Sequence, residues 1–323
     1  MSLQLLSLSD VKQSITMSQA IAAMENAFLQ LATHQVKLPL RTGINIDKEQ
    51  ALTLTMPAYL EQDNALGLKV VSIFPNNPAQ NKPAITGFIM LLDARTGEPK
   101  ALMDAAFLTS LRTGAISGLV TQYFAREDAK HVAIIGSGVQ AETQLEAVAT
   151  VRDIQQVSIW SRDVKNARKF AKKMAHQYDI NVYESVPLAI RDADIICTAT
   201  GSTEALIHLG DVQAHAHINA IGSHTPNMKE LSNDLLNRAI VIVDQISAVL
   251  AESGEIISAL AHNQLKQETM IEIGEWLTHK NTNYQNCLTV FKSVGLSIQD
   301  LSVASVVYNQ AMDKKLGIPF ELN

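Results

Sequence analysis

The chain has 323 residues, which is more than one hydrophobic core usually supports, so we expect two domains. Its 26 basic and 32 acidic residues give a net charge of -6 with no long basic run, which argues against nucleic acid as the main partner. No uncharged apolar stretch reaches bilayer length, the N-terminus lacks a signal-peptide pattern, and the two cysteines lack metal-ligand spacing, so we expect a cytoplasmic protein without a metal site.

The first third of the chain predicts a helix followed by an antiparallel sheet. Apolar residues at helical spacing between Met17 and Leu31 predict the helix. From residue 38 to 104, short β-branched or alternating runs are separated by Pro, Asn and Gly, which is typical of strands. Residues 93–99 predict a hairpin loop between strands at 88–92 and 100–103. A helix is expected over residues 105–124.

Strands and helices alternate in the second part of the chain. We expect strands at 131–135, 157–160, 193–199, 218–221 and 239–244, and helices at 141–151 and 166–178. Such alternation, with strands that are apolar throughout, is typical of a Rossmann-type α/β domain, a doubly wound parallel sheet covered on both faces. A further helix at 301–313 is expected to return to the first domain. The predicted domains are therefore 1–115 with 305–323, and 116–304.

The segment Gly136-Ser137-Gly138-Val139-Gln140-Ala141 follows an apolar strand and opens a helix. In this GxGxxA pattern the first glycine makes a tight turn, the second lets the backbone approach a pyrophosphate, and the alanine allows close packing. The helix N-terminus offers N–H groups to phosphates. An ordinary glycine-rich turn is the alternative, which the further strands disfavour. The loop predicts that a nicotinamide dinucleotide binds at Gly136, Gly138, Val139 and Gln140.

The residues after the next strands indicate which dinucleotide binds. Strand 157–160 ends in Ser161-Arg162, where NAD-preferring domains carry an acid that binds the ribose hydroxyls. Arg162 can pair with a 2′-phosphate, which favours NADPH, although NADH remains an alternative if Asp163 reaches the ribose. Thr198-Ala199-Thr200 end another strand and are expected near the cofactor ribose, or are ordinary turn residues.

Three motifs carry a family resemblance: Leu111-Arg112-Thr113-Gly114-Ala115, the stretch from Gly222-Ser223-His224 to Leu231, and Phe291-Lys292-Ser293-Val294-Gly295-Leu296. Over nearly the whole chain, the sequence resembles the ornithine cyclodeaminase and mu-crystallin family. The resemblance implies a Rossmann domain, an N-terminal α+β substrate domain that dimerises through its antiparallel sheet, and hydride transfer between a nicotinamide and the carbon of an α-imino acid.

The resemblance also implies roles for individual residues. Arg41, Lys69 and Arg112 would bind the substrate carboxylate. Lys69 stands inside the apolar run 67–71, where an ammonium is costly unless it meets an anion, although an edge-strand lysine is an equal alternative. Taken alone, Arg41 is equally well read as a solvated loop residue, and Arg112 would also suit a cofactor phosphate. Asp300 would contact the cofactor or cap the helix that follows it. The cofactor-binding residues implied by the resemblance are Thr113, Gly222, Ser223, Ser293, Gly295 and Asp300.

Two departures from the ornithine cyclodeaminase pattern narrow the range of expected substrates. Leu54 and His224 occupy positions where that enzyme has carboxylates for the substrate amines, so ornithine cyclisation is disfavoured. The expected reaction is NADPH-dependent reduction of delta-1-pyrroline-2-carboxylate to L-proline, with delta-1-piperideine-2-carboxylate, which gives L-pipecolate, as a second substrate. The proton would come from water or Lys69, and His224 would orient that water or cap its loop.

Other functions also fit the sequence. Within the family, the chain would also suit an alanine dehydrogenase that uses NADH, an ornithine cyclodeaminase, or an enzyme that dehydrates a hydroxyproline. A non-catalytic protein of the mu-crystallin type, which holds NADPH and a small apolar ligand, is an alternative from another class. Lys69 and Arg112 argue against it, because an apolar ligand would not require two cations.

Overall fold

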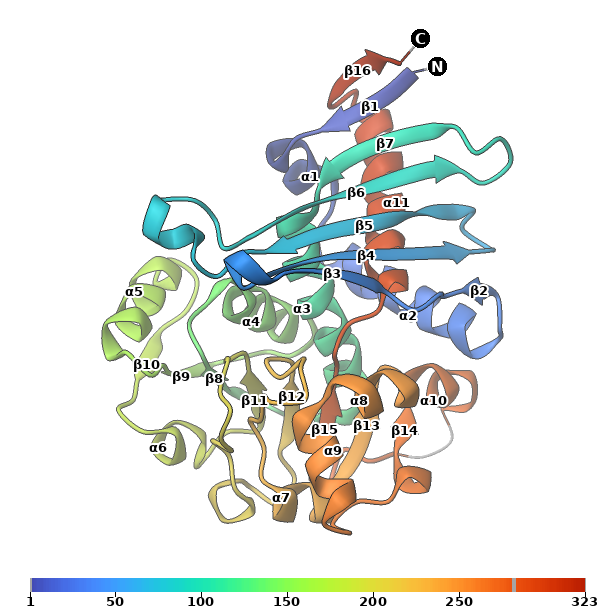
Figure 1. Cartoon of the computed structure of the whole chain (residues 1–323). Helices are drawn as coiled ribbons and strands as arrows, with labels where there is room; N and C mark the ends of the chain where they lie inside the picture. The colour runs from blue at the N-terminus through green and yellow to red at the C-terminus, as the bar shows by residue number, and fades with distance from the viewer. Residues whose placement is uncertain (1, 281–282, 323) are drawn as a thin grey trace. The chain divides into compact units, whose positions relative to one another are not determined.

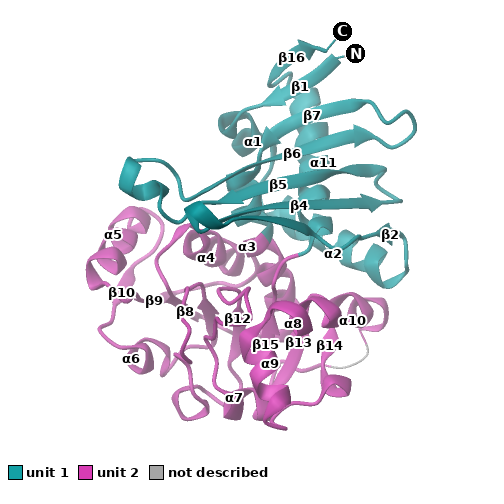
Figure 2. Ribbon diagram, viewed as in Figure 1, with its two compact units in different colours: residues 1–112, 296–323 teal, residues 113–295 magenta. Residues whose placement is uncertain are grey.

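The computed structural model describes residues 2–280 and 283–322, so Met1 and Asn323, the outer limits of the expected first domain, lie outside the described range. The chain divides into unit 1, residues 1–112 and 296–323, and unit 2, residues 113–295 (Figure 2). The expected boundaries at 115/116 and 304/305 lie somewhat further along the chain, inside two helices. The second one differs because the helix over Ser297–Asp313 packs as one piece in unit 1.

Unit 1 contains an extended sheet with helices packed against it, as expected for an α+β domain (Figure 1). Its strand order is β16-β1-β7-β6-β5-β4-β2, and β3 also pairs with β4. Neighbours from β2 to β7 are antiparallel, whereas β1 pairs with β7 in parallel. The elements of unit 1 are β1 Ser2–Leu6, α1 Leu8–Ser14, α2 Met17–Ala32, β2 Val36–Lys37, β3 Thr42–Ile46, η1 Asp47–Glu49, β4 Ala51–Leu60, β5 Ala65–Ile73, η2 Asn77–Gln80, β6 Ile85–Asp93, β7 Pro99–Asp104, α11 Ser297–Asp313 and β16 Ile318–Glu321.

A local signal explains where helix α2 begins. Thr16 caps α2 in a capping box with Gln19, since the threonine hydroxyl accepts from the Gln19 N–H and the Gln19 side chain accepts from the Thr16 N–H.

Helix α11 packs against α2 and against strands β4, β5 and β6. It is buried along most of its length, and this position brings residues from the end of the chain to the middle of the sheet.

Unit 2 is a doubly wound parallel sheet with the order β10-β9-β8-β11-β12-β15-β13-β14, which confirms the predicted Rossmann fold. Alternate residues of β8 enter two separate cores, Val132 and Ile134 on one face and Ala133 and Ile135 on the other. The elements are α3 Ala105–Phe124, which begins in unit 1, β8 His131–Ile135, α4 Val139–Val151, β9 Gln156–Trp160, α5 Val164–Met174, β10 Ile180–Val182, α6 Val186–Ile190, β11 Ile195–Thr198, η3 Leu209–Asp211, β12 His217–Ala220, α7 Asn233–Arg238, β13 Ile240–Val243, α8 Ile246–Glu252, α9 Gly254–Ala261, η4 Gln267–Thr269, β14 Ile271–Glu272, α10 Ile273–His279 and β15 Thr289–Lys292.

The strand order of unit 2 reverses between β8 and β11, because the chain first builds outward through β9 and β10 and then continues on the other side of β8. Ligands of doubly wound sheets bind at the carboxyl ends of strands at such a reversal. Within residues 2–280 and 283–322, no helix combines the length and the apolar character needed to cross a bilayer.

Candidate active site

Lys69 is a buried cation in the middle of the unit 1 sheet. It lies on β5, between β4 and β6, and is 2% exposed, so the edge-strand interpretation is wrong. Its Nζ lies 2.6 Å from Oδ2 of Asp300, a fully buried carboxylate in the first turn of α11. Burial of an isolated ammonium is costly, and this carboxylate offsets the cost.

Arg112, on α3, meets the same carboxylate from another direction. Its Nε lies 3.1 Å from Asp300 Oδ1, and its Nη1 donates to Gln299 Oε1 at 2.6 Å. Gln299 is itself fixed, because the same Oε1 accepts the N–H of Leu296. Adjacent residues at the start of α11 therefore hold the guanidinium by two of its nitrogen atoms.

Electrostatics bring a third cation into this group, which we call the cation cluster: Arg41, Lys69, Arg112 and Asp300. Burial lowers the pKa of Lys69 to about 8; the charge of Asp300 opposes this shift, while the positive charges of Arg112 and Arg41 add to it. Arg41 is half-buried between β2 and β3. Asp300 is shared by two buried cations, Lys69 and Arg112, so this part of the cluster favours a further anion, and it includes an ammonium that can release its proton near neutral pH.

The phosphate loop of unit 2 depends on two glycines for different reasons. Gly136 has a φ of 116°, and a Cβ there would lie 2.4 Å from the carbonyl oxygen of Ala199, so only glycine fits. Gly138 has a φ of -80° and is the N-cap of α4. A Cβ at Gly138 would meet no atom of the described residues within 4 Å. The loop thus leaves open space in front of the first N–H groups of α4, which suits a pyrophosphate.

A cavity of about 270 Å³ lies beside this loop. The end of β9 and the segment after β11 complete its wall; the lining residues are Gly136, Ser137, Trp160, Ser161, Arg162, Ala199, Thr200, Gly201, Ser202 and Leu206. Ser137 Oγ donates to Ser161 Oγ at 2.9 Å, which ties the phosphate loop to the end of β9. Asp163 Oδ1 accepts the Lys165 N–H as the cap of α5. The cavity therefore offers an exposed arginine, while the neighbouring carboxylate is engaged in capping.

Glu230, to which the sequence analysis assigned no role, organises the ends of β11 and β12. Its carboxylate accepts from the hydroxyl of Thr198 and from both the N–H and the hydroxyl of Thr200, each at 2.7 Å. It also accepts the N–H groups of Gly222 at 2.9 Å and Ser223 at 3.3 Å. Burial raises the pKa of Glu230, whereas Lys292 and the threonine hydroxyls favour its ionised form. Thr198, Thr200, Gly222 and Ser223 are thus held as one group.

Two more buried acids fix neighbouring segments of unit 2. Lys292, at the end of β15, lies 3.0 Å from Glu255 Oε1 and donates to the carbonyl oxygen of Ser223. Asp244 Oδ2, after β13, accepts from the Ser293 hydroxyl at 2.8 Å and from the Gly295 N–H at 2.9 Å. Asp244 directly follows the end of β13, which is a signal that the sequence offered, whereas Glu255 lies in the first turn of α9, where no such signal marks it.

The remaining predicted site residues differ in exposure. Thr113 is buried on α3, and its carbonyl oxygen accepts from Gln144 Nε2. Val139 is 68% exposed in the first turn of α4. The buried Oε1 of Gln140 has no hydrogen-bond partner within the described part of the chain. His224 is exposed in the loop after β12, and its Nδ1 donates to the Gly222 carbonyl oxygen at 2.9 Å.

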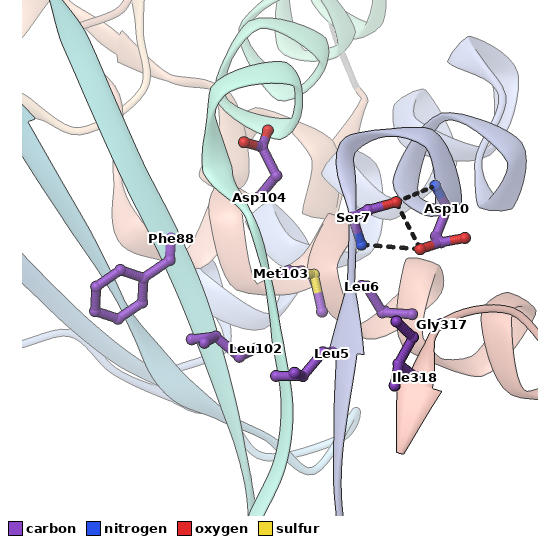
Figure 3. A pocket seen from close by; sticks show the side chains of 10 residues that line it. All are labelled: Leu5, Leu6, Ser7, Asp10, Phe88, Leu102, Met103, Asp104, Gly317 and Ile318. Carbon is purple, nitrogen blue, oxygen red and sulfur yellow. Dashed lines mark hydrogen bonds between the residues drawn. The ribbon is translucent and has the colours of Figure 1, made fainter. Parts of the chain in front are cut away.

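Unit 1 also has an open groove of about 500 Å³, whose lining includes no residue of the cation cluster (Figure 3). Its lining is mainly apolar and includes Leu5, Leu6, Ser7, Asp10, Phe88, Leu102, Met103, Asp104, Gly317 and Ile318. Phe88 and Ile318 are 39% and 67% exposed. Ser7 and Asp10 bond to each other in the capping box of α1, so the polar groups at its margin are satisfied locally.

Known proteins resemble this chain over its full length. A Delta(1)-pyrroline-2-carboxylate reductase from Bacillus cereus is 35% identical over 318 residues, which cover 97% of this chain and 98% of that protein. The solved structure of Thermococcus litoralis Delta(1)-pyrroline-2-carboxylate reductase, in complex with NADH and L-proline, has a TM-score of 0.94 and 37% identity, and the match covers 98% of this chain and 99% of that one.

An archaeal alanine dehydrogenase dimer with bound NAD has a TM-score of 0.93 and 32% identity, with both chains covered fully at 100%. The family model of the ornithine cyclodeaminase/mu-crystallin family matches residues 1–315. The relatives, the fold and the motifs agree, and this chain therefore belongs to the ornithine cyclodeaminase/mu-crystallin family.

Proposed function

We propose that this chain is an oxidoreductase that uses a nicotinamide dinucleotide to reduce the C=N bond of a cyclic imino acid. The substrate proposed first is delta-1-pyrroline-2-carboxylate, which gives L-proline. The cation cluster is the observation that carries this proposal, since it combines an anion site with a buried ammonium whose pKa is lowered to about 8. The names of the relatives in Bacillus cereus and Thermococcus litoralis support the same reaction.

The chemistry requires one hydride and one proton for each C=N bond. A reduced dinucleotide held at the phosphate loop of Gly136 and Gly138 would supply the hydride. In the proposed reaction, Arg112 and Arg41 bind the substrate carboxylate, and Lys69 donates a proton to the ring nitrogen, directly or through water. Lys69 then regains a proton from solvent, and the product is the saturated amino acid.

Ornithine cyclisation fits this chain less well. Met56 pairs with Lys69 between β4 and β5, and Leu54 pairs with Val71, so Leu54 shares a sheet face with Lys69. A carboxylate at residue 54 would therefore be on the face that carries the ammonium. The chain has a leucine there, and the exposed His224 replaces the second acid expected of a cyclodeaminase. Neither side chain would hold a second substrate amine as a carboxylate does.

The test is a panel of substrates monitored by the absorbance of the reduced cofactor. We expect NADPH oxidation with delta-1-pyrroline-2-carboxylate, and slower oxidation with the piperideine homologue. We expect no comparable rate with pyruvate plus ammonium, and no cofactor reduction with L-ornithine. Faster turnover of pyruvate plus ammonium would identify an alanine dehydrogenase instead. Dinucleotide binding without turnover of any substrate would favour a binding protein.

We propose NADPH as the cofactor because a positively charged residue, Arg162, lines the cavity beside the phosphate loop. Arg162 is exposed and lines the cavity, where a 2′-phosphate would gain a charge-assisted contact. Asp163 is occupied as the cap of α5, so it competes less for the ribose hydroxyls. Structures that resemble this chain contain NADH or NAD, so kinetics with both cofactors test the proposed preference.

Replacing Arg162 with glutamine is expected to lower kcat/KM for NADPH by about tenfold, with little change for NADH, since a hydrogen bond to a charged group is worth about 1.5–3 kcal/mol and solvent screens this exposed one. The measurement is kcat/KM for both cofactors at a saturating imine concentration. Arg168→Gln, an exposed arginine on α5 outside the cavity lining, is the matched control. Equal losses with both cofactors, or a wild-type preference for NADH, would contradict the NADPH assignment.

The proposal also includes a homodimer and a cytoplasmic location. The apolar groove, with exposed Phe88, Ile318 and Phe320 nearby on the sheet, supports a homodimer formed through unit 1. The archaeal relative of known structure is a dimer. Cys197 and Cys287 are free thiols, which is compatible with the proposed cytoplasmic location.

A further inference from the structure

Asp300 links its own helix, α11, to strand β5 and to the first part of helix α3 through one carboxylate. Its Oδ2 binds Lys69 of β5, which is 231 residues distant in sequence, and its Oδ1 binds Arg112 of α3, which is 188 residues distant. The carboxylate has no exposed surface. Both of its oxygen atoms are therefore engaged by the cations that the proposed function uses.

We propose that Asp300 is a positioning residue for imine reduction: it fixes Lys69 as the proton donor and Arg112 as the carboxylate ligand without touching substrate or cofactor. This inference rests on the proposed function. It replaces the role expected from the sequence, in which Asp300 contacts the cofactor. It also differs from helix capping, because the side chain bonds to Lys69 and Arg112.

The geometry explains why two cations need this partner. A lysine ammonium on four flexible carbons has no preferred direction, and a buried carboxylate at 2.6 Å supplies one. The guanidinium is planar, so contacts from Asp300 at Nε and Gln299 at Nη1 fix the plane in which its remaining N–H groups point. Without Asp300, Lys69 and Arg112 would be two buried like charges that repel each other.

The same contact sets the proton affinity of Lys69. The charged groups that act on Lys69 are Asp300 from α11, Arg112 from α3, and Arg41 from the segment between β2 and β3. Asp300 favours the ammonium, whereas burial and the two arginines disfavour it. Removing the carboxylate charge leaves only the effects that lower the pKa of Lys69, so the proton donor would be lost at a lower pH.

The experiment compares Asp300→Asn and Asp300→Glu with the wild type. Asparagine has nearly the same shape without the charge, while glutamate retains the charge with an altered reach. For D300N we expect kcat/KM for the imine to fall by about 100-fold, as when reacting groups are misplaced by about 1 Å. We expect the basic limb of its pH–rate profile to move to lower pH by about one to three units. For D300E the limb should remain close to that of the wild type, although kcat is reduced.

The controls separate positioning from other roles. Asp313→Asn changes an exposed carboxylate at the other end of α11 and should leave the profile unchanged. Dinucleotide affinity, measured by fluorescence titration, should be the same in D300N and the wild type. If D300N does not fold, as judged by thermal unfolding, D300E still tests the inference through its kcat and its pH profile.

Three outcomes overturn the inference. The first is that D300N, or a folded D300E, has the kcat, KM and pH profile of the wild type. The second is that the basic limb of D300E moves to lower pH as far as that expected for D300N. The third is a D300N variant that loses dinucleotide affinity with an unmoved basic limb, which would return Asp300 to the cofactor. If the wild-type chain does not reduce the imine, the proposed function itself is refuted. If the wild type is active but substitutions of Asp300 change neither its rate nor its pH profile, only the inference about Asp300 fails.

Discussion

Replacing Lys69 with methionine is expected to lower kcat/KM for delta-1-pyrroline-2-carboxylate by about 10²–10⁴-fold, the usual contribution of a positioned proton donor. Methionine retains the apolar stem but cannot donate a proton or contribute charge. In the wild type, reduction should decline as the pH rises through about 8, because the ammonium of Lys69 is lost there. This limb should be absent in K69M. The measurement is kcat/KM for the imine as a function of pH.

Lys37→Met is the matched control, because Lys37 lies on β2 of the same sheet with its side chain 70% exposed. K37M should retain wild-type rates, and K69M should retain wild-type dinucleotide affinity, which shows that unit 2 is intact. A K69M enzyme that keeps both its rate and its basic limb would remove Lys69 from the chemistry. The proton would then have to come from water alone.

Replacing Gly138 with alanine is expected to weaken dinucleotide binding by about 100-fold, or ~2.8 kcal/mol. The added Cβ would enter the open space in front of α4 and push the pyrophosphate away from the N–H groups of the helix. The φ of -80° suits alanine, so the fold should tolerate the change. The expected cost to helix capping is about 0.5–1 kcal/mol. Dissociation constants and thermal unfolding give the two quantities.

Gly210→Ala provides the comparison, since Gly210 is exposed in unit 2 and a Cβ there also meets no described atom within 4 Å. It lies outside the residues that line the cavity. G210A should bind the dinucleotide normally. Unchanged affinity in G138A would mean that the pyrophosphate does not approach this loop, and the Rossmann assignment of the binding site would need revision.

The elements with strong local signals were predictable from sequence. Strand β8 is apolar at every position after its first, and a buried parallel strand requires this. The helix α3 was expected over the range in which it occurs, Ala105–Phe124. Helix α5 was less well predicted, because Asp163 caps it and starts it at Val164, and it ends at Met174 rather than at residue 178.

Non-local pairing explains what the sequence did not reveal. Strand β15 lies between β12 and β13, although it follows both in the chain, so neighbours in the sheet are not neighbours in sequence. Likewise, β1 pairs in parallel with β7, a strand that is distant from it in sequence. No local pattern specifies which distant strand will occupy an adjacent position.

The candidate site was predictable to the extent that single residues were chemically conspicuous. The cost of burying an ammonium in an apolar strand drew attention to Lys69, and the structure shows it buried with a carboxylate. The same reasoning applies to Lys292 at the end of β15 and was not used there. The partner of Lys69 was not identifiable, because Asp300 lies 231 residues away. Glu230 lay within a recognised motif, but its acceptor role depends on strand ends brought together by folding.

The discontinuity of unit 1 has a consequence for synthesis on the ribosome. Residues 113–295 are contiguous, so unit 2 can acquire all of its own strands before the last segment has been translated. Unit 1 contains the N-terminal strands, but it is complete only when α11 and β16 have been added. Strand β16 pairs with β1 (Figure 1). Until residue 300 emerges, the nascent N-terminal sheet carries Lys69 without its counter-ion, so the order of translation delays completion of unit 1 until α11 has been made.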